Sequence, residues 1–148
     1  MKTVISVILM ILGFSSCGII FGHKTADAIK SPQVSHLYKQ ALEENAKGLV
    51  RFEKAILLLN DADQIEPRNA IILHERGLIK IHSEIDKKGG FQDLGKSIQY
   101  SKDEKDKLIR YNNRGISYMA NGDLNKACED WSRAGKNGES YIEKYCNE

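Results

Sequence analysis

The sequence contains little of what a turn-rich β fold or a metal-stapled domain needs. Its 148 residues include only two prolines and one tryptophan, so few positions interrupt a helix and many-stranded architectures are disfavoured. Its three cysteines form no C-x-x-C pair, which excludes a recognisable zinc ribbon or thioredoxin-type site. The 22 lysines and arginines nearly balance the 20 aspartates and glutamates, so no nucleic-acid partner is expected.

Sequence signals of an enzyme are missing as well. Neither G-x-x-x-x-G-K-[ST] nor G-x-S-x-G occurs. His74 and His82 are two helical turns apart, and mainly Leu78 and Ile81 stand between them, so ordinary histidines are favoured over a metal pair. We therefore expect no catalytic residues, no metal and no cofactor. An undetected hydrolase would need a pocket with a perturbed acid or base, and the sequence offers no candidate.

The first twenty residues have the composition of a secretory signal. Lys2 gives a short basic start, and an uncharged, mostly apolar stretch of 19 residues follows from Val4 to Gly22. Within this stretch, Phe14-Ser15-Ser16-Cys17 resembles a bacterial lipobox, with phenylalanine in place of the usual leucine. The resemblance implies cleavage before Cys17, lipidation of that cysteine, for example with palmitate, and a domain held outside the cytoplasm in the bacterial cell envelope. The alternative is an uncleaved signal anchor, because 19 residues can just cross a bilayer.

Composition divides the remaining chain into a tether and a helical domain. Residues 1–16 are interpreted as the signal peptide, and residues 17–34, which lack periodicity, as the lipidated cysteine and its tether. Residues 35–148 must then hold the core.

The clearest internal pattern lies near the C-terminus. Spacings of three and four residues place its members on one helical face, and Asn121-Gly122-Asp123 between the two halves is typical of a helix stop followed by an N-cap. The pattern therefore predicts helix, tight turn, helix. Its members are Tyr111, Gly115, Tyr118, Gly122, Ala127, Trp131 and Ala134.

This series resembles a tetratricopeptide repeat (TPR), with Arg114 in place of the usual leucine and Glu139 in place of the closing proline. The resemblance implies an all-α fold, a short right-handed α-solenoid of about three helix-turn-helix repeats. We place the repeats at about 36–69, 70–107 and 108–138, and a capping helix at 139–147.

The two upstream copies are less regular. In the first, Glu43 occupies the glycine position, while the second helix keeps its pattern from Phe52 to Pro67. In the second, Gly77 matches the glycine, and Leu94 is aligned with Ala127 of the third copy. That alignment leaves five extra residues, which we place around Glu84–Gly90 and interpret as the end of a lengthened first helix.

The resemblance also implies a function. In TPR proteins the first helices line a concave groove that holds a peptide or helix, so the chain is expected to be a membrane-tethered module that binds a protein partner. The alternative is a structural envelope-assembly subunit that self-associates through the groove, as a homodimer. A chaperone-type carboxylate clamp is rejected because its cationic positions are not kept. The groove positions transferred to this chain are Gln40, Glu44, His74, Leu78, Ile81, His82, Ile109, Asn112, Ile116 and Met119.

Two further expectations concern packing. Trp131 should be buried between the helices of the third copy, and Gly115 should lie at a close helix approach. Once Cys17 is assigned to lipid, Cys128 and Cys146 remain as an even pair in an oxidising compartment, and a turn near Gly138 could bring them together. A disulfide is therefore predicted, with two unpaired cysteines as the alternative.

Overall fold

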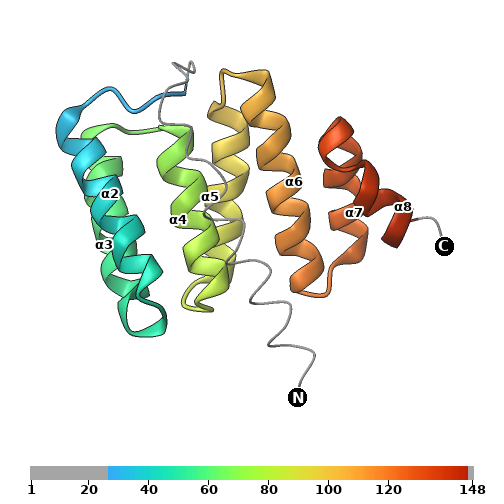
Figure 1. The fold of residues 1–148 in the computed structure, drawn as a ribbon, viewed down its shortest axis with the longest axis horizontal. Coiled ribbons are helices and arrows are strands. Elements are labelled where there is room, and N and C mark those ends of the chain that lie inside the picture. Colours follow the sequence, from blue (N-terminus) through green and yellow to red (C-terminus); the bar gives the residue numbers. More distant parts are fainter. Residues whose placement is uncertain (1–26, 147–148) are drawn as a thin grey trace.

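A computed structural model describes residues 27–146 of the chain. These residues form helices and turns and contain no strand, which confirms the all-α prediction (Figure 1). The helices are α2 (Pro32–Ala46), α3 (Phe52–Ile65), α4 (Ala70–His82), α5 (Lys87–Tyr100), α6 (Glu104–Ala120), α7 (Leu124–Arg133) and α8 (Glu139–Tyr145), with short 3-10 turns η1 (Leu49–Arg51) and η2 (Gly135–Asn137).

Short polar side chains begin most of these helices. The Ser31 hydroxyl accepts a hydrogen bond from the backbone N–H of Val34, and Pro32 occupies the first helical turn, where its missing N–H costs nothing. Asparagine or aspartate side chains cap four further helices in the same way. These caps are Asn69 (α4), Asp86 (α5), Asp103 (α6) and Asp123 (α7).

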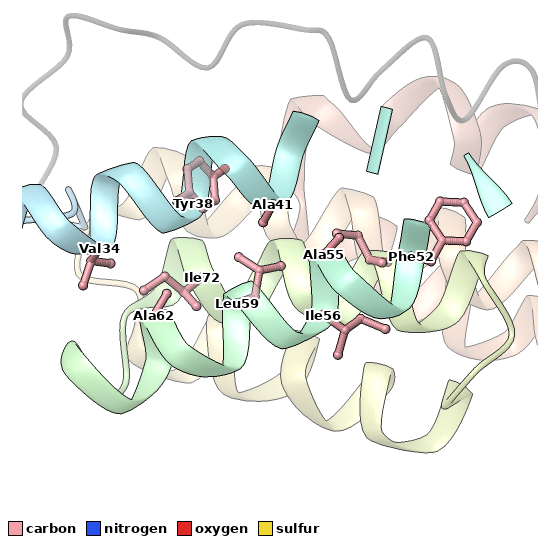
Figure 2. Close-up of a cluster of buried hydrophobic side chains, with 10 residues drawn as sticks. Val34, Tyr38, Ala41, Phe52, Ala55, Ile56, Leu59, Ala62 and Ile72 are labelled. Carbon is pink, nitrogen blue, oxygen red and sulfur yellow. The ribbon is translucent and has the colours of Figure 1, made fainter. Parts of the chain in front are cut away.

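Consecutive helices run up and down and pack in pairs, α2 with α3, α4 with α5 and α6 with α7 (Figure 1). The second helix of each of the first two pairs also contacts the first helix of the next, and α8 packs on α7. A cluster of buried apolar side chains lies in the first pair and extends to α4, with Leu59 and Ile72 fully buried in it (Figure 2). Burial of these side chains supplies the main driving force for pairing.

An arginine–aspartate bridge repeats in the second and third pairs. Arg76 of α4 donates two hydrogen bonds to Asp93 of α5, at 2.8 and 2.9 Å, and Arg114 of α6 donates two to Asp130 of α7, both at 2.7 Å. All four side chains are at most 16% exposed, so the charges need these bidentate partners. The two arginines thus occupy equivalent positions, each one residue before the buried glycine of its helix pair, Gly77 or Gly115.

These bridges correct the alignment of the middle copy. Leu94 and Trp131 each follow the bridging aspartate, and they lie 17 and 16 residues after Gly77 and Gly115. The middle pair is therefore longer by one residue and not by five. The expected match of Leu94 with Ala127 is wrong, because Leu94 takes the place of the tryptophan.

The expected end of a helix at Asp86–Gly90 is also wrong. Helix α4 ends at His82, and Asp86 caps the start of α5 by accepting a hydrogen bond from the Gly89 N–H. Lys87 and Lys88 thus begin a helix. Gly89 and Gly90 lie inside the first turns of α5, where Gly90 allows close approach to α4.

The end of the expected tether packs against the helices. Asp27 is buried and accepts hydrogen bonds from the Ser101 hydroxyl (2.6 Å) and the Lys102 N–H (2.7 Å). It also forms an ion pair with Arg110 at 3.1 Å. The chain is therefore fixed to the domain from Asp27 onward, and residues 17–26, with Cys17, lie outside the described residues.

The C-terminal expectations are confirmed. Trp131 is fully buried, and a Cβ on Gly115 would come within 2.7 Å of its indole nitrogen. Cys128 and Cys146 form a disulfide with a Cα–Cα distance of 5.9 Å, which fastens the end of α8 to α7. Tyr141 of α8 stacks on Trp131, with ring centroids 4.8 Å apart. Helix α8 thus covers the last helix pair.

Candidate binding face

The first helices of the three pairs, α2, α4 and α6, share one face, which we call the first-helix face. Asn113 of α6 reaches His74 of α4, with the amide nitrogen 3.0 Å from the imidazole Nε2. Tyr38 of α2 is an electrostatic neighbour of both Glu75 on α4 and Arg110 on α6. Side chains from all three helices therefore meet, although they are separated by up to 75 residues in sequence.

A three-residue spacing shared by the three helices explains why these side chains lie together. Tyr38, His74 and Asn112 each stand three residues before a buried small residue, namely Ala41, Gly77 and Gly115. Residues three apart are neighbours on a helix. Each first helix therefore packs its small residue against the second helix of its pair and places Tyr38, His74 or Asn112 next to that contact.

His74 is held uncharged. Burial, assisted by the nearby charge of Arg110, lowers the pKa of His74 to about 3. Its Nε2 faces Asn113, while its Nδ1 is buried without a partner. The ring therefore offers this face a neutral hydrogen-bonding group at physiological pH.

Among the titratable groups of this face, Glu75 has the pKa closest to neutral pH. Burial raises the pKa of Glu75 to about 7, so its carboxyl group is roughly half protonated at neutral pH. Its carboxylate forms no hydrogen bond or ion pair with a described residue. Burial and the Glu75 charge together raise the pKa of Tyr38, so that phenol stays protonated.

Arg110 links this face to the start of the described chain. It is 5% exposed, and its Nη1 contacts Asp27 at 3.1 Å and donates to the Ser101 hydroxyl at 3.0 Å. Burial lowers the pKa of Arg110, and the charge of Asp27 opposes that shift. Its Nε is buried without a partner, so only one edge of the guanidinium is satisfied.

Unpaired buried polar atoms concentrate on the first-helix face. Among the described residues five buried side-chain atoms lack a hydrogen-bond partner, and three belong here: His74 Nδ1, Arg110 Nε and Asn112 Oδ1. Each buried atom without a hydrogen-bond partner lowers the free energy of unfolding, because its desolvation is not compensated. The first-helix face therefore holds most of the unsatisfied hydrogen-bonding capacity found among the buried side chains of the described residues.

The apolar residues predicted for the groove divide into two groups. Leu78, Ile116 and Met119 are half-buried, and Ile109 is 38% exposed, so all four remain accessible beside the polar cluster. Ile81 is 3% exposed and packs against α5, where a Cβ on Gly90 would come within 2.6 Å of it. Ile81 is thus a core residue and does not line the face.

The residues predicted from the first copy are placed differently. Glu44 is buried and pairs with Lys47 and Lys54, each at 3.1 Å, which lower its pKa by hydrogen bonding. It thus joins the end of α2 to α3. Gln40 is half-buried, and Glu43, expected at the glycine position, is exposed.

Four residues of this face were missed as site residues, namely Tyr38, Glu75, Arg110 and Asn113. Tyr38 had a usable signal, because Val34, Tyr38 and Ala41 follow the four-and-three spacing of a buried helix face. The shift of the first copy by two residues, from Glu43 to Ala41, hid it. Glu75 and Arg110 had no signal in the sequence, because their importance comes from neighbours on other helices.

Two general features complete the description. No group of three histidine, cysteine, aspartate or glutamate side chains within residues 27–146 is arranged to hold a metal ion, and His82 is exposed. None of the described helices combines the length and apolar character that a bilayer crossing requires.

Comparison with protein-family models, curated proteins and solved structures yields no match to this chain.

Proposed function

We propose that this chain is a TPR-like protein-binding module, tethered to a bacterial membrane through lipid on Cys17, that captures a partner segment on its first-helix face. The pairwise helices and the repeated arginine–aspartate bridges support a short right-handed solenoid of three repeats with α8 as its cap. The resemblance of residues 14–17 to a lipobox supports the tether.

The observation that carries the binding proposal is the set of unpaired polar groups on the first-helix face. It contains the Arg110 Nε–H and the Asn112 carbonyl, both buried without a hydrogen-bond partner, and half-buried Glu75, whose carboxylate also has none. A peptide backbone both donates and accepts hydrogen bonds, and half-buried Leu78 and Ile116 provide apolar contact alongside. A peptide or helix of a protein partner therefore fits this face.

Binding is favoured over catalysis because the perturbed groups lack a reactive neighbour. Glu75 has a pKa of about 7, which suits a general acid or base. The raised pKa of Tyr38 keeps its hydroxyl protonated, and the lowered pKa of His74 leaves that imidazole a weak base. Neither group is activated as a nucleophile.

The proposal is tested by site-specific photocrosslinking of the full chain in a bacterial envelope. A crosslinking residue at Leu78 or Ile116 should yield a discrete adduct with another protein. The same residue at Glu53 or Lys96, exposed on α3 and α5, should not. Adding Glu75→Gln, which preserves shape and removes the charge, should weaken the adduct from position 78.

Two results would change the conclusion. An adduct of twice the chain mass would favour the self-associating envelope subunit. Equal labelling from all four positions, or none from the first-helix face, would overturn partner binding there.

A further inference from the structure

Three cations without ion-pair partners surround one pocket at the edge where the described chain begins. Lys30, Arg68 and Lys102 line a pocket of about 170 Å³ between the N-terminal segment, the α3–α4 turn and the α5–α6 turn. All three are exposed, and none forms an ion pair with a described residue. We call this surface the basic edge.

The acidic residues of the same pocket are already engaged. Asp27 pairs with Arg110 and accepts from the Lys102 N–H. The Glu66 carboxylate accepts hydrogen bonds from the backbone N–H of Lys30 and Ser31 and from the Asn69 amide. Asp27 is thus paired inside the domain and Glu66 is held by hydrogen bonds without an ion pair, so the three exposed cations outnumber the one remaining negative charge of the pocket.

The backbone holds Arg68 in an unusual conformation. Its φ is +63°, in the left-handed region that few non-glycine residues adopt. Its guanidinium lies 5.8 Å from the centroid of the Tyr100 ring. Arg68 is therefore oriented at the pocket by the turn and by an aromatic contact, without using its charge in an ion pair.

The short sequence distance between Cys17 and the basic edge indicates the kind of partner that this edge would bind. Asp27, fixed beside Lys102, is ten residues from Cys17, and ten residues extend at most about 36 Å. The start of α2 and the α3–α4 and α5–α6 turns lie at one end of the helix pairs, opposite the α2–α3, α4–α5 and α6–α7 turns (Figure 1). A lipid on Cys17 would therefore hold the domain within about 36 Å of the membrane by a segment that joins it at the basic edge, and the exposed cations of this edge favour its contact with an anionic surface.

We propose that the basic edge docks on the anionic phospholipid headgroups of the membrane in which the chain is anchored. This inference rests on the proposed lipid anchor. Lysine and arginine pair with phosphate, and each cation near an anionic surface strengthens binding about fivefold. Docking through this edge would hold the domain in one orientation.

The test uses the full chain, purified from a bacterial membrane and reconstituted in phosphatidylcholine vesicles with or without phosphatidylglycerol. Lysine acetylation is followed residue by residue by mass spectrometry. Phosphatidylglycerol should slow the modification of Lys30 and Lys102 about fivefold or more, and high salt should reverse this. Lys88, exposed at the opposite end, should react equally in both vesicles.

A matched pair of triple variants distinguishes docking through the basic edge from a nonspecific effect of the net charge of the domain. Phosphatidylglycerol should also protect exposed Lys105, in the first turn of α6, and the triple variant Lys30→Gln/Arg68→Gln/Lys102→Gln should lose that protection. Lys87→Gln/Lys88→Gln/Lys126→Gln removes the same charge from the opposite end and should keep it. Circular dichroism should show that both variants fold, because every replaced side chain is exposed.

The outcomes distinguish the two proposals. A chain that fails to float with neutral vesicles lacks a membrane anchor, whereas a chain that floats but shows equal acetylation in both vesicles has an anchor and no docking. Protection of Lys30 and Lys102 by inorganic phosphate with neutral vesicles would assign the basic edge to a soluble anion and overturn lipid docking.

Discussion

Gly77 and Gly90 lie back to back where α4 and α5 cross. A Cβ added to either glycine would come within 2.8 Å of the carbonyl oxygen of the other. Because both obstacles are backbone atoms, no side-chain rotation can relieve the clash. This contact sets how closely the middle helix pair packs, as the contact of Gly115 with Trp131 does in the third pair.

Replacing Gly90 with alanine should destabilise the protein although alanine is the better helix former. The added methyl would meet the Gly77 carbonyl and the side chain of Ile81, so we expect a loss of about 1–3 kcal/mol in the free energy of unfolding. Gly95→Ala, in the same helix, is the matched control. Its Cβ meets only Arg114 Nη1 at 3.6 Å, so it should stabilise by about 0.5–1 kcal/mol. Urea denaturation of both variants measures the difference, and a stabilised Gly90→Ala would contradict the packing.

Removing the buried tryptophan should be among the most costly single changes. Trp131 fills the space between α6, α7 and α8, so Trp131→Ala should lower the free energy of unfolding by about 3–5 kcal/mol. A Gly115→Leu variant should also be destabilised, because its side chain would overlap the indole. A melting temperature unchanged by Gly115→Leu would show that the pairing of α6 with α7 is misassigned.

The disulfide should stabilise the C-terminal end in particular. Its loop of 17 residues corresponds to about 3 kcal/mol in the chain-entropy model, so Cys128→Ser/Cys146→Ser should lose about that amount. Hydrogen exchange should increase most in α8, which contributes no fully buried residue. Mass spectrometry of the non-reduced protein provides the direct check, and two free thiols would refute the bridge.

Glu75 should make stability depend on pH with a definite sign. Its pKa is raised from 4.5 to about 7, so the folded state holds the proton more tightly than the unfolded chain does. The stability that Glu75 contributes is therefore complete below about pH 4.5 and is lost as pH rises through 7. His74 acts in the opposite direction, because its pKa is lowered to about 3. The stability that neutral His74 contributes is lost as pH falls from 6.5.

Comparison with Glu75→Gln isolates the carboxyl group, because the contribution of His74 cancels in the difference. The variant should match the parent near pH 4 and exceed its stability by up to about 3 kcal/mol above pH 7. Thermal or urea unfolding across this range measures the effect. A difference that does not change with pH would mean that Glu75 has an ordinary pKa.

Cys17 should be required for membrane attachment and processing. Cys17→Ala should leave an uncut precursor and abolish incorporation of a labelled fatty acid, because the resemblance to a lipobox implies lipid on that cysteine. Cys17→Ser is a stricter control, since it changes little but the thiol. Maturation of the alanine variant to the normal size would replace the lipobox interpretation with ordinary signal cleavage.

Local sequence patterns predicted the individual helices more reliably than they predicted how the helix pairs align with one another. Ser31, Asn69, Asp103 and Asp123 are ordinary N-caps, and the apolar spacing around Trp131 located the third pair closely. The middle pair was misaligned because Gly89-Gly90 has the composition of a turn. Only contact with Gly77 on another helix shows that Gly90 is a packing position.

The sequence by itself determined the helical class, the third helix pair and the cysteine pair, because each depends on spacing along one or two adjacent helices. The tertiary structure decided the first-helix face. Tyr38, Glu75 and Arg110 belong to three helices. Burial shifts the pKa of all three, and charges on other segments also act on Tyr38 and Arg110. Burial and charge proximity depend on how the helices stack, a property that no single segment of the sequence encodes.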